Sequence, residues 1–213
     1  MLKPLEGITV LVTRPAQQAQ LFCDRVVDAG GTAVCFPSLE IQALPLSASD
    51  LEMIHPLEQF DFGLFISRNA VRFGVPLIKA EGFVPATLRF IAVGKSTAAA
   101  LAEYHLPVAV VPAAGFSSEA LLAEPDLQDL SGKKILIFKG QGGRTLLKET
   151  LTARGAKVSS VDLYRRIRPV FDADVAIRYL GLPSRKIIAL TSGDAARNLL
   201  AMIGRLGDQS LKD

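Results

Sequence analysis

Short apolar runs alternate along this chain with segments whose apolar residues recur at helical spacing. The run at 8–13 is rich in β-branched residues and predicts a buried strand. A helix over 17–29 follows, which Gly30-Gly31 ends, and a second strand is predicted at 32–36. Alternating strands and helices predict an α/β fold whose parallel sheets are covered on both faces.

The pattern repeats at a fixed offset of 125 residues. The stretch at 10–14 returns at 135–139, and Ser67 returns as Ser192. Because the offset is the same in each block, the spacing between blocks is preserved too, which indicates a duplicated unit. Two similar lobes in one chain predict a cleft between them, and such clefts are favoured ligand sites.

The repeat also predicts the strand pairing and the extent of the second copy. If the first block pairs with the copy of the second block, the chain crosses between lobes at two connectors, 38–44 and 164–170. A third block, with a strand at 90–93, would have its copy just beyond Asp213. We therefore expect one strand–helix–strand unit to be absent, and favour a truncated sequence, because the helix at 195–206 would otherwise lead to no further strand.

Composition narrows the class of protein. The net charge of +3 is compatible with an anionic ligand but too weak to indicate nucleic acid. The first residues lack the pattern of a signal peptide, and no apolar run reaches the ~18 residues of a membrane span, so we expect a cytoplasmic protein without membrane attachment. Cys23 and Cys35 are in no metal-ligand spacing and are expected to be small buried residues in a reducing compartment.

Small, hydroxyl-bearing, glycine and cationic residues follow the predicted strands, and almost no acid does. In parallel sheets ligands bind outside the carboxyl ends of the strands, and small or glycine-rich turns open backbone N–H groups that suit anions. Each turn alone is equally compatible with a helix N-cap. The predicted anion contacts are Thr13, Arg14, Ser67, Lys95, Ser96, Thr97, Ser118, Lys139, Gly140, Gly142, Arg144, Thr191 and Ser192.

Other chemistries find little support. The glycine pattern after 134–139 suggests a nucleotide, but the dinucleotide fingerprint requires glycine where Thr145 stands. Neither His55 nor His105 falls at a predicted strand end, and no carboxylates cluster there, so no metal site is expected. If the protein is an enzyme, it works by shape, hydrogen bonding and anion recognition.

Six motifs follow one another along the chain, and they are Leu11-Val12-Thr13-Arg14-Pro15, Phe65-Ile66-Ser67-Arg68-Asn69-Ala70-Val71, Ala92-Val93-Gly94-Lys95-Ser96-Thr97-Ala98, Ser118-Glu119-Ala120-Leu121-Leu122, Gly140-Gln141-Gly142-Gly143-Arg144 and Val161-Asp162-Leu163-Tyr164. Their order and spacing resemble those of the uroporphyrinogen-III synthase (HemD) family over essentially the whole chain.

The resemblance implies two flavodoxin-like lobes, 1–37 plus 171–213 and 45–163, joined by a two-stranded connector. It implies a monomer without metal or organic cofactor. The family converts the linear tetrapyrrole hydroxymethylbilane into uroporphyrinogen III, losing water, closing the macrocycle and inverting the last pyrrole ring through a spirocyclic intermediate.

Tyr164 matches the family's cleft tyrosine, which is proposed to help the substrate hydroxyl leave as water, and Thr97 matches a threonine that faces the cleft. The alternative for Tyr164 is a connector tyrosine anchored by its ring. The alternative for the whole protein is a non-catalytic two-lobed receptor for an anion or small molecule.

Overall fold

The computed structural model describes residues 3–143, 145–170 and 172–210, and the chain divides into two units. Unit 1 comprises Met1–Ile41 and Arg166–Asp213, and unit 2 comprises Gln42–Arg165. The chain passes between the units within two strands, β3 (Glu40–Ala43) and β8 (Lys157–Ile167). The strand β8 therefore continues through the beginning of the segment that the sequence predicts as a connector at 164–170.

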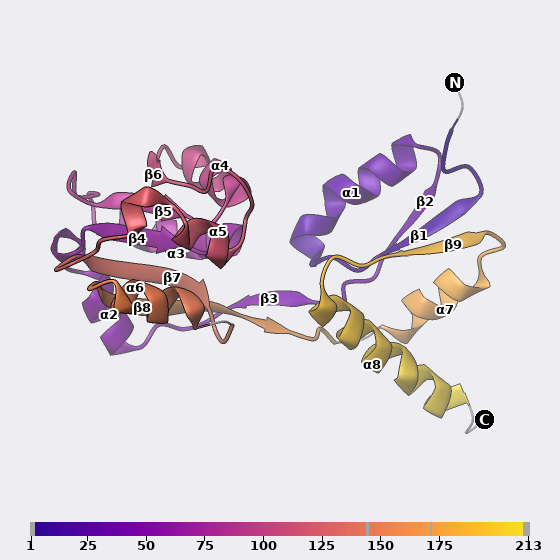
Figure 1. The fold of residues 1–213 in the computed structure, drawn as a ribbon. Helices are drawn as coiled ribbons and strands as arrows, with labels where there is room; N and C mark the ends of the chain where they lie inside the picture. Colours follow the sequence, from indigo (N-terminus) through magenta and orange to yellow (C-terminus); the bar gives the residue numbers. More distant parts are fainter. Residues whose placement is uncertain (1–2, 144, 171, 211–213) are drawn as a thin grey trace. The chain divides into compact units, whose positions relative to one another are not determined.

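Unit 1, in its described residues, contains a three-stranded sheet in the order β2-β1-β9, with parallel pairing throughout. One face carries a cluster in which Val10 and Val12 pack with Cys23 and Val26, and the other a cluster of Leu11 with Tyr179 and residues of two C-terminal helices. Helix α1 thus covers one face, and α7 and α8 the other (Figure 1). Its elements are β1 (Ile8–Val12), α1 (Ala16–Asp28), β2 (Thr32–Cys35), α7 (Ala173–Gly181), β9 (Arg185–Ala189) and α8 (Gly193–Ser210).

Unit 2 is built on a sheet whose described strands run in the order β3-β8-β7-β4-β5-β6. The pairs β8-β7, β7-β4, β4-β5 and β5-β6 are parallel. Its further elements are α2 (Ala48–Ile54), the 3-10 turn η1 (Leu57–Gln59), β4 (Phe62–Phe65), α3 (Arg68–Ala80), β5 (Arg89–Ala92), α4 (Lys95–Glu103), β6 (Val108–Val110), α5 (Ser118–Leu122), the 3-10 turn η2 (Pro125–Leu127), β7 (Lys134–Gly140) and α6 (Leu146–Ala153).

The two faces of this sheet have different cores. Leu64 and Ile137 belong to a largely aliphatic cluster that includes residues of α5 and α6. On the other face the rings of Phe65 and Phe138 stack, with their centroids 4.5 Å apart. Helix α3 lies against these rings at Gly74, where a Cβ would come within 3.0 Å of Phe65. Glycine at this position lets the helix approach the sheet closely.

The strand register reproduces the repeat of the sequence. Val10 of β1 pairs with Ile187 of β9, and Ile135, which is the counterpart of Val10, pairs with Phe62, the counterpart of Ile187. The other edges match in the same way, since the pair of Thr9 with Thr32 returns as Lys134 with Lys157. The first block thus pairs with the copy of the second in unit 1, and the second block pairs with the copy of the first in unit 2.

The strands β9 and β4 are counterparts in the repeat, but their outer sides differ in strand pairing and exposure. In unit 2 the strand β5 pairs with β4, and Phe65 is 0% exposed. In the described part of unit 1 no strand pairs with the outer side of β9, and Leu190, the counterpart of Phe65, is 48% exposed. The apolar residues Ile187 and Ile188 of β9 are exposed as well.

Several local features differ from the sequence predictions. Helix α4 begins at Lys95 rather than after Thr97, and Gly140 is the last residue of β7 rather than part of a turn. Cys23 is buried as expected, whereas Cys35 is exposed, because β2 is an edge strand of its sheet. Among the helices of the described ranges, none has the length and apolar character needed to cross a bilayer.

Candidate active site

The hydroxyl of Tyr164 connects β8 to the turn that follows β4 in unit 2. Its Oη lies 2.9 Å from Oγ of Ser67, which lies between the end of β4 at Phe65 and the start of α3 at Arg68. The Tyr164 side chain is 0% exposed, and its ring stacks on Phe73 with the centroids 5.9 Å apart. Tyr164 is thus a strand residue whose polar end lies at the carboxyl edge of the sheet.

A bulge in β8 gives Tyr164 this position. Lys139 is in register with Asp162, but the next residue of β7, Gly140, is in register with Tyr164, so Leu163 is the extra residue. A bulge of this kind re-aims the side chain that follows it. A Cβ on Gly140 would lie 2.6 Å from two carbon atoms of the Tyr164 ring. Gly140 is therefore required by the packing of Tyr164, which removes one reason for assigning it to a nucleotide.

Ser67 has a second role, since its Oγ accepts a hydrogen bond from the backbone N–H of Ala70 at 3.0 Å. Ser192 does the same for Ala195 at 3.1 Å in the matching position of the repeat. Both serines are N-caps of helices that follow strands, which is the alternative role that the sequence allows for such turns. Ser67 differs from Ser192 in that it also holds the tyrosine hydroxyl.

Lys139 is engaged within unit 2. Its Nζ lies 2.7 Å from Oδ1 of Asp162 and 3.3 Å from the carbonyl oxygens of Gly140 and Gly142. The ammonium group therefore holds the exposed glycine turn in place, with its charge partly neutralised. Gly142 has φ +73°, which glycine adopts without strain. The predicted contact Arg144 lies outside the described residues.

The first turn of α4 carries three of the predicted contacts. Lys95 and Ser96 are exposed, and Lys95 makes no ion pair within the described ranges, whereas Thr97 is almost fully buried. Gly94 caps the helix at a point where a Cβ would lie 2.9 Å from that of Phe116. At α5 the cap is Ser117, and the predicted contact Ser118 is the half-buried first residue of the helix.

In unit 1 the predicted contacts separate into engaged and accessible groups. Thr13 is 0% exposed and its Oγ1 donates a 2.7 Å hydrogen bond to the carbonyl of Ala189, so it ties the ends of β1 and β9 together. The hydroxyl is thus engaged within the protein, and the expectation that Thr13 contacts a ligand stays a prediction. Arg14 is half-buried with its guanidinium over the Phe22 ring, 5.4 Å from the centroid, and pairs with no carboxylate in the described part of the chain. Thr191 is exposed.

Ser38 organises the carboxyl edge of the unit 1 sheet, and sequence reasoning missed it. Ser38 is 0% exposed, and its Oγ donates a 2.9 Å hydrogen bond to the carbonyl of Ala195. Its own carbonyl accepts from Asn198 at 2.8 Å. Ser38 thus fixes the start of α8 beside the end of β2, and only burial, which the sequence does not show, distinguishes it from other serines.

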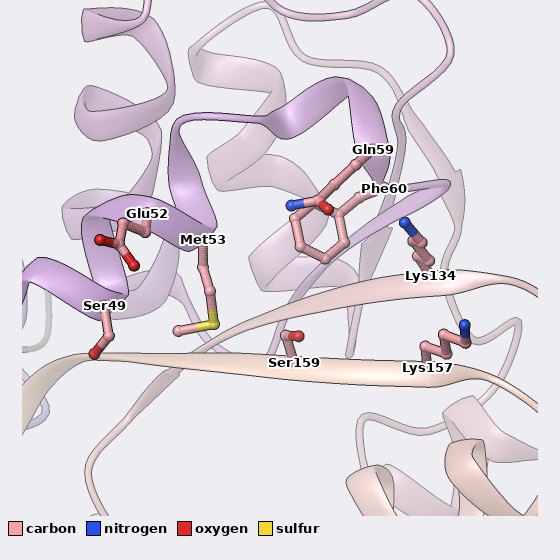
Figure 2. Close-up of a pocket in the computed structure, with 8 residues that line it drawn as sticks. All are labelled: Ser49, Glu52, Met53, Gln59, Phe60, Lys134, Lys157 and Ser159. Carbon is pink, nitrogen blue, oxygen red and sulfur yellow. The ribbon is translucent and has the colours of Figure 1, made fainter.

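A pocket of about 490 Å³ lies at the opposite end of the unit 2 sheet (Figure 2). Lys134 and Lys157 are the first residues of β7 and β8 and are paired in register. Met53 and Phe60 add apolar surface. None of the predicted contacts lines this pocket, whose complete lining is Ser49, Glu52, Met53, Gln59, Phe60, Lys134, Lys157 and Ser159.

Among the described residues no group of three or more histidine, cysteine, aspartate or glutamate side chains is arranged to hold a metal ion.

Comparison with known proteins assigns the chain to a family. The family model described as uroporphyrinogen-III synthase HemD matches residues 22–213. The uroporphyrinogen-III synthase of Salmonella typhimurium is 35% identical over 202 residues, which cover 92% of this chain and 80% of that protein.

The chain belongs to the uroporphyrinogen-III synthase family.

A second member of the uroporphyrinogen-III synthase family, from Escherichia coli, is 33% identical over 201 residues, which cover 92% of this chain and 80% of that protein. A uroporphyrinogen III synthase structure from Thermus thermophilus superposes with a TM-score of 0.63 at 20% identity, covering 91% of this chain and 76% of that one. The enzyme from Helicobacter pylori gives 0.55 at 14% identity, covering 93% and 78%. These likenesses confirm the predicted α/β fold with its parallel sheets.

Proposed function

We propose that this protein converts hydroxymethylbilane into uroporphyrinogen III, as the family resemblance implies. The observation that carries the proposal is the match to named uroporphyrinogen-III synthases at up to 35% identity over 92% of the chain. The reaction loses one water molecule, closes the macrocycle and inverts the last pyrrole ring. It needs neither a metal nor an organic cofactor in this proposal.

Binding of the substrate is proposed to rest on the accessible groups at the strand ends. The substrate carries eight carboxylates, for which cations, hydroxyls and helix N-termini are the expected complement. Arg14 and Lys95 suit this role because neither makes an ion pair within the described residues. The exposed residues Ser96 and Thr191 add hydroxyl groups. Lys139 contributes indirectly, by holding the glycine turn beside it.

Catalysis is proposed to consist of positioning and charge stabilisation. The linear tetrapyrrole tends to close without inversion, so the protein must favour the conformer in which the substituted carbon of the last ring attacks. Departure of the substrate hydroxyl requires a proton, and a hydrogen-bond donor at that oxygen stabilises the developing charge. No nucleophilic side chain is needed for either step.

Tyr164 is the proposed donor, with Ser67 as the residue that positions its hydroxyl. Support comes from the 2.9 Å contact between the two oxygens at the carboxyl edge of the sheet. Because the tyrosine is 0% exposed, the side chains around it must move before its hydroxyl can donate to the substrate. We propose that Tyr164 speeds the reaction without being essential to it, because positioning of the substrate alone already favours ring inversion.

The proposed roles are tested by steady-state kinetics on hydroxymethylbilane. Replacing Tyr164 by Phe keeps the ring packing, and we expect kcat to fall about 10- to 100-fold, at or below the low end of general-acid effects. Unchanged turnover would remove Tyr164 from the mechanism. Replacing Arg14 by Ala should raise KM about 10-fold, whereas Arg25→Ala, in the last turn of α1, should leave KM unchanged.

We further propose that the protein acts as a monomer in the cytoplasm. The family resemblance supports the monomer, and the free thiols of Cys23 and Cys35 are compatible with a reducing compartment. Size-exclusion chromatography with light scattering at the assay concentration measures the first of these. A dimeric mass would contradict it.

A further inference from the structure

The two cysteines of the chain meet in unit 1. Cys23 lies on the buried side of α1, and Cys35 is the last residue of the edge strand β2. Their sulfur atoms are 2.8 Å apart. Non-bonded carbon atoms are best separated by about 3.5–4.0 Å, and sulfur is larger than carbon, so this is closer than an ordinary contact between two thiols.

We propose that Cys23 and Cys35 form a reversible disulfide that fastens α1 to β2. A disulfide bond measures about 2.05 Å, so bonding requires the two sulfur atoms to approach by less than 1 Å. Eleven residues separate the cysteines, and they include the Gly30-Gly31 turn between helix and strand. The elements that the bond would join are therefore already held side by side by the fold.

The two thiols have different roles because their surroundings differ. Cys35 is exposed and meets an oxidant from solvent, whereas Cys23 is buried in the cluster of α1 and β1. Burial, followed by the hydrogen bond with Cys35, raises the pKa of the Cys23 thiol to about 12, which keeps it protonated and unreactive alone. Cys35 is the attacking thiol, and Cys23 resolves the intermediate.

The chemistry balances with a hydroperoxide as oxidant. Cys35 attacks hydrogen peroxide, giving the sulfenic acid and one water. The sulfur of Cys23 then attacks that of Cys35, its proton leaves with the displaced hydroxide, and a second water forms with the disulfide. Two thiols are thus oxidised and one peroxide reduced, and a dithiol reductant reverses the change.

The bond would restrain the part of unit 1 that carries a proposed substrate contact. Helix α1 begins at Ala16, two residues after Arg14. A disulfide restricts the unfolded chain, so the oxidised protein should resist heat and proteolysis in this unit. We expect the thermal midpoint to rise by about 4 °C or more on oxidation.

Peptide mapping tests the pairing directly, because Arg25 lies between the cysteines. Trypsin does not cleave before Pro4 or Pro15, so it yields peptides 1–25 and 26–68, each with one cysteine. After peroxide treatment and blocking with N-ethylmaleimide, we expect one disulfide-linked species, two hydrogen atoms lighter than the sum of the two peptides. Reduction should release the peptides separately.

Two variants assign the roles and control for misfolding. Cys35→Ser should yield no linked species and leave Cys23 unlabelled in the folded protein, while Cys23→Ala should leave a sulfenic acid on peptide 26–68 that a dimedone probe captures. Circular dichroism checks that both variants fold. The proposal is overturned if, after the peroxide-treated protein is unfolded in denaturant, both cysteines still take up maleimide fully, or if the linked peptides come only from covalent dimers.

Discussion

Replacing Gly140 by Ala tests the packing that places Tyr164. The added Cβ would lie 2.6 Å from Cε2 and Cζ of the tyrosine ring, closer than real contacts allow, so the ring must move. Overpacking a buried site costs about 1–3 kcal/mol, and losing the hydrogen bond to Ser67 costs about 1 kcal/mol more. Alanine returns about 0.5–1 kcal/mol, because glycine is unfavourable in a strand. We expect a net loss of about 1–3.5 kcal/mol.

Hydrogen exchange read by mass spectrometry at the amides of β7 is the suitable assay. The chain has no tryptophan, and a protein with two units need not unfold in one step, whereas exchange reports the opening free energy of β7 itself. The matched background is Tyr164→Leu, which removes the two ring atoms that meet the new Cβ. In that background Gly140→Ala should cost less than about 0.5 kcal/mol.

Equal costs in the two backgrounds would show that the alanine destabilises β7 by some route other than the tyrosine ring. A cost below about 0.5 kcal/mol in the unaltered background would contradict the close approach of Gly140 to Tyr164. Either result would refute the reasoning that assigns Gly140 to packing rather than to a nucleotide phosphate.

Two further predictions concern single side chains. Ser67→Ala should lower stability by about 2–4 kcal/mol, since it removes a helix cap and leaves the buried Tyr164 hydroxyl without this partner. Ser192→Ala should cost only the cap, about 1 kcal/mol. Hydrogen exchange in α3 and α8 compares the two losses, and equal losses would contradict the second role of Ser67. The pKa of Asp61 is held below its usual value chiefly by the N–H of Lys134 at 2.8 Å, with help from the Lys133 ammonium. Asp61→Asn should therefore lower stability by up to about 1 kcal/mol at pH 7. Hydrogen exchange in β4 and β7 should show this difference shrinking as the pH falls below the ordinary aspartate pKa of about 3.9 and vanishing below the lowered pKa of Asp61. A difference that persists there would rule out the carboxylate as its source.

The repeat made much of the fold predictable. A fixed offset keeps the hydrophobic pattern and the spacing of strands together, so the pairing of Val10 with Ile187 implies that of Ile135 with Phe62. The sequence also contains a helix-start signal for α2, which the hydrophobic pattern alone does not reveal. Ser47 and Asp50 form a capping box, a pattern that marks a helix start.

The candidate site was less predictable, because the partner of a polar side chain depends on packing between distant segments. Thr13 and Arg14 are adjacent in the chain, yet the first is fully engaged with the carbonyl of Ala189 and the second pairs with no described carboxylate. The residues at 161–164 continue a strand pattern with no mark of the bulge. The bulge arises from pairing with β7 and decides where the Tyr164 hydroxyl lies.

The isomer composition of the product tests the central proposal most directly. Hydroxymethylbilane supplied to the purified protein closes to type I uroporphyrinogen without a catalyst and to type III with a uroporphyrinogen-III synthase. After oxidation, chromatography separates the two uroporphyrins, with an enzyme-free sample as the control. We predict that type III predominates and that its yield rises with protein concentration, whereas type I alone, formed at the rate of the control, would contradict the proposed function.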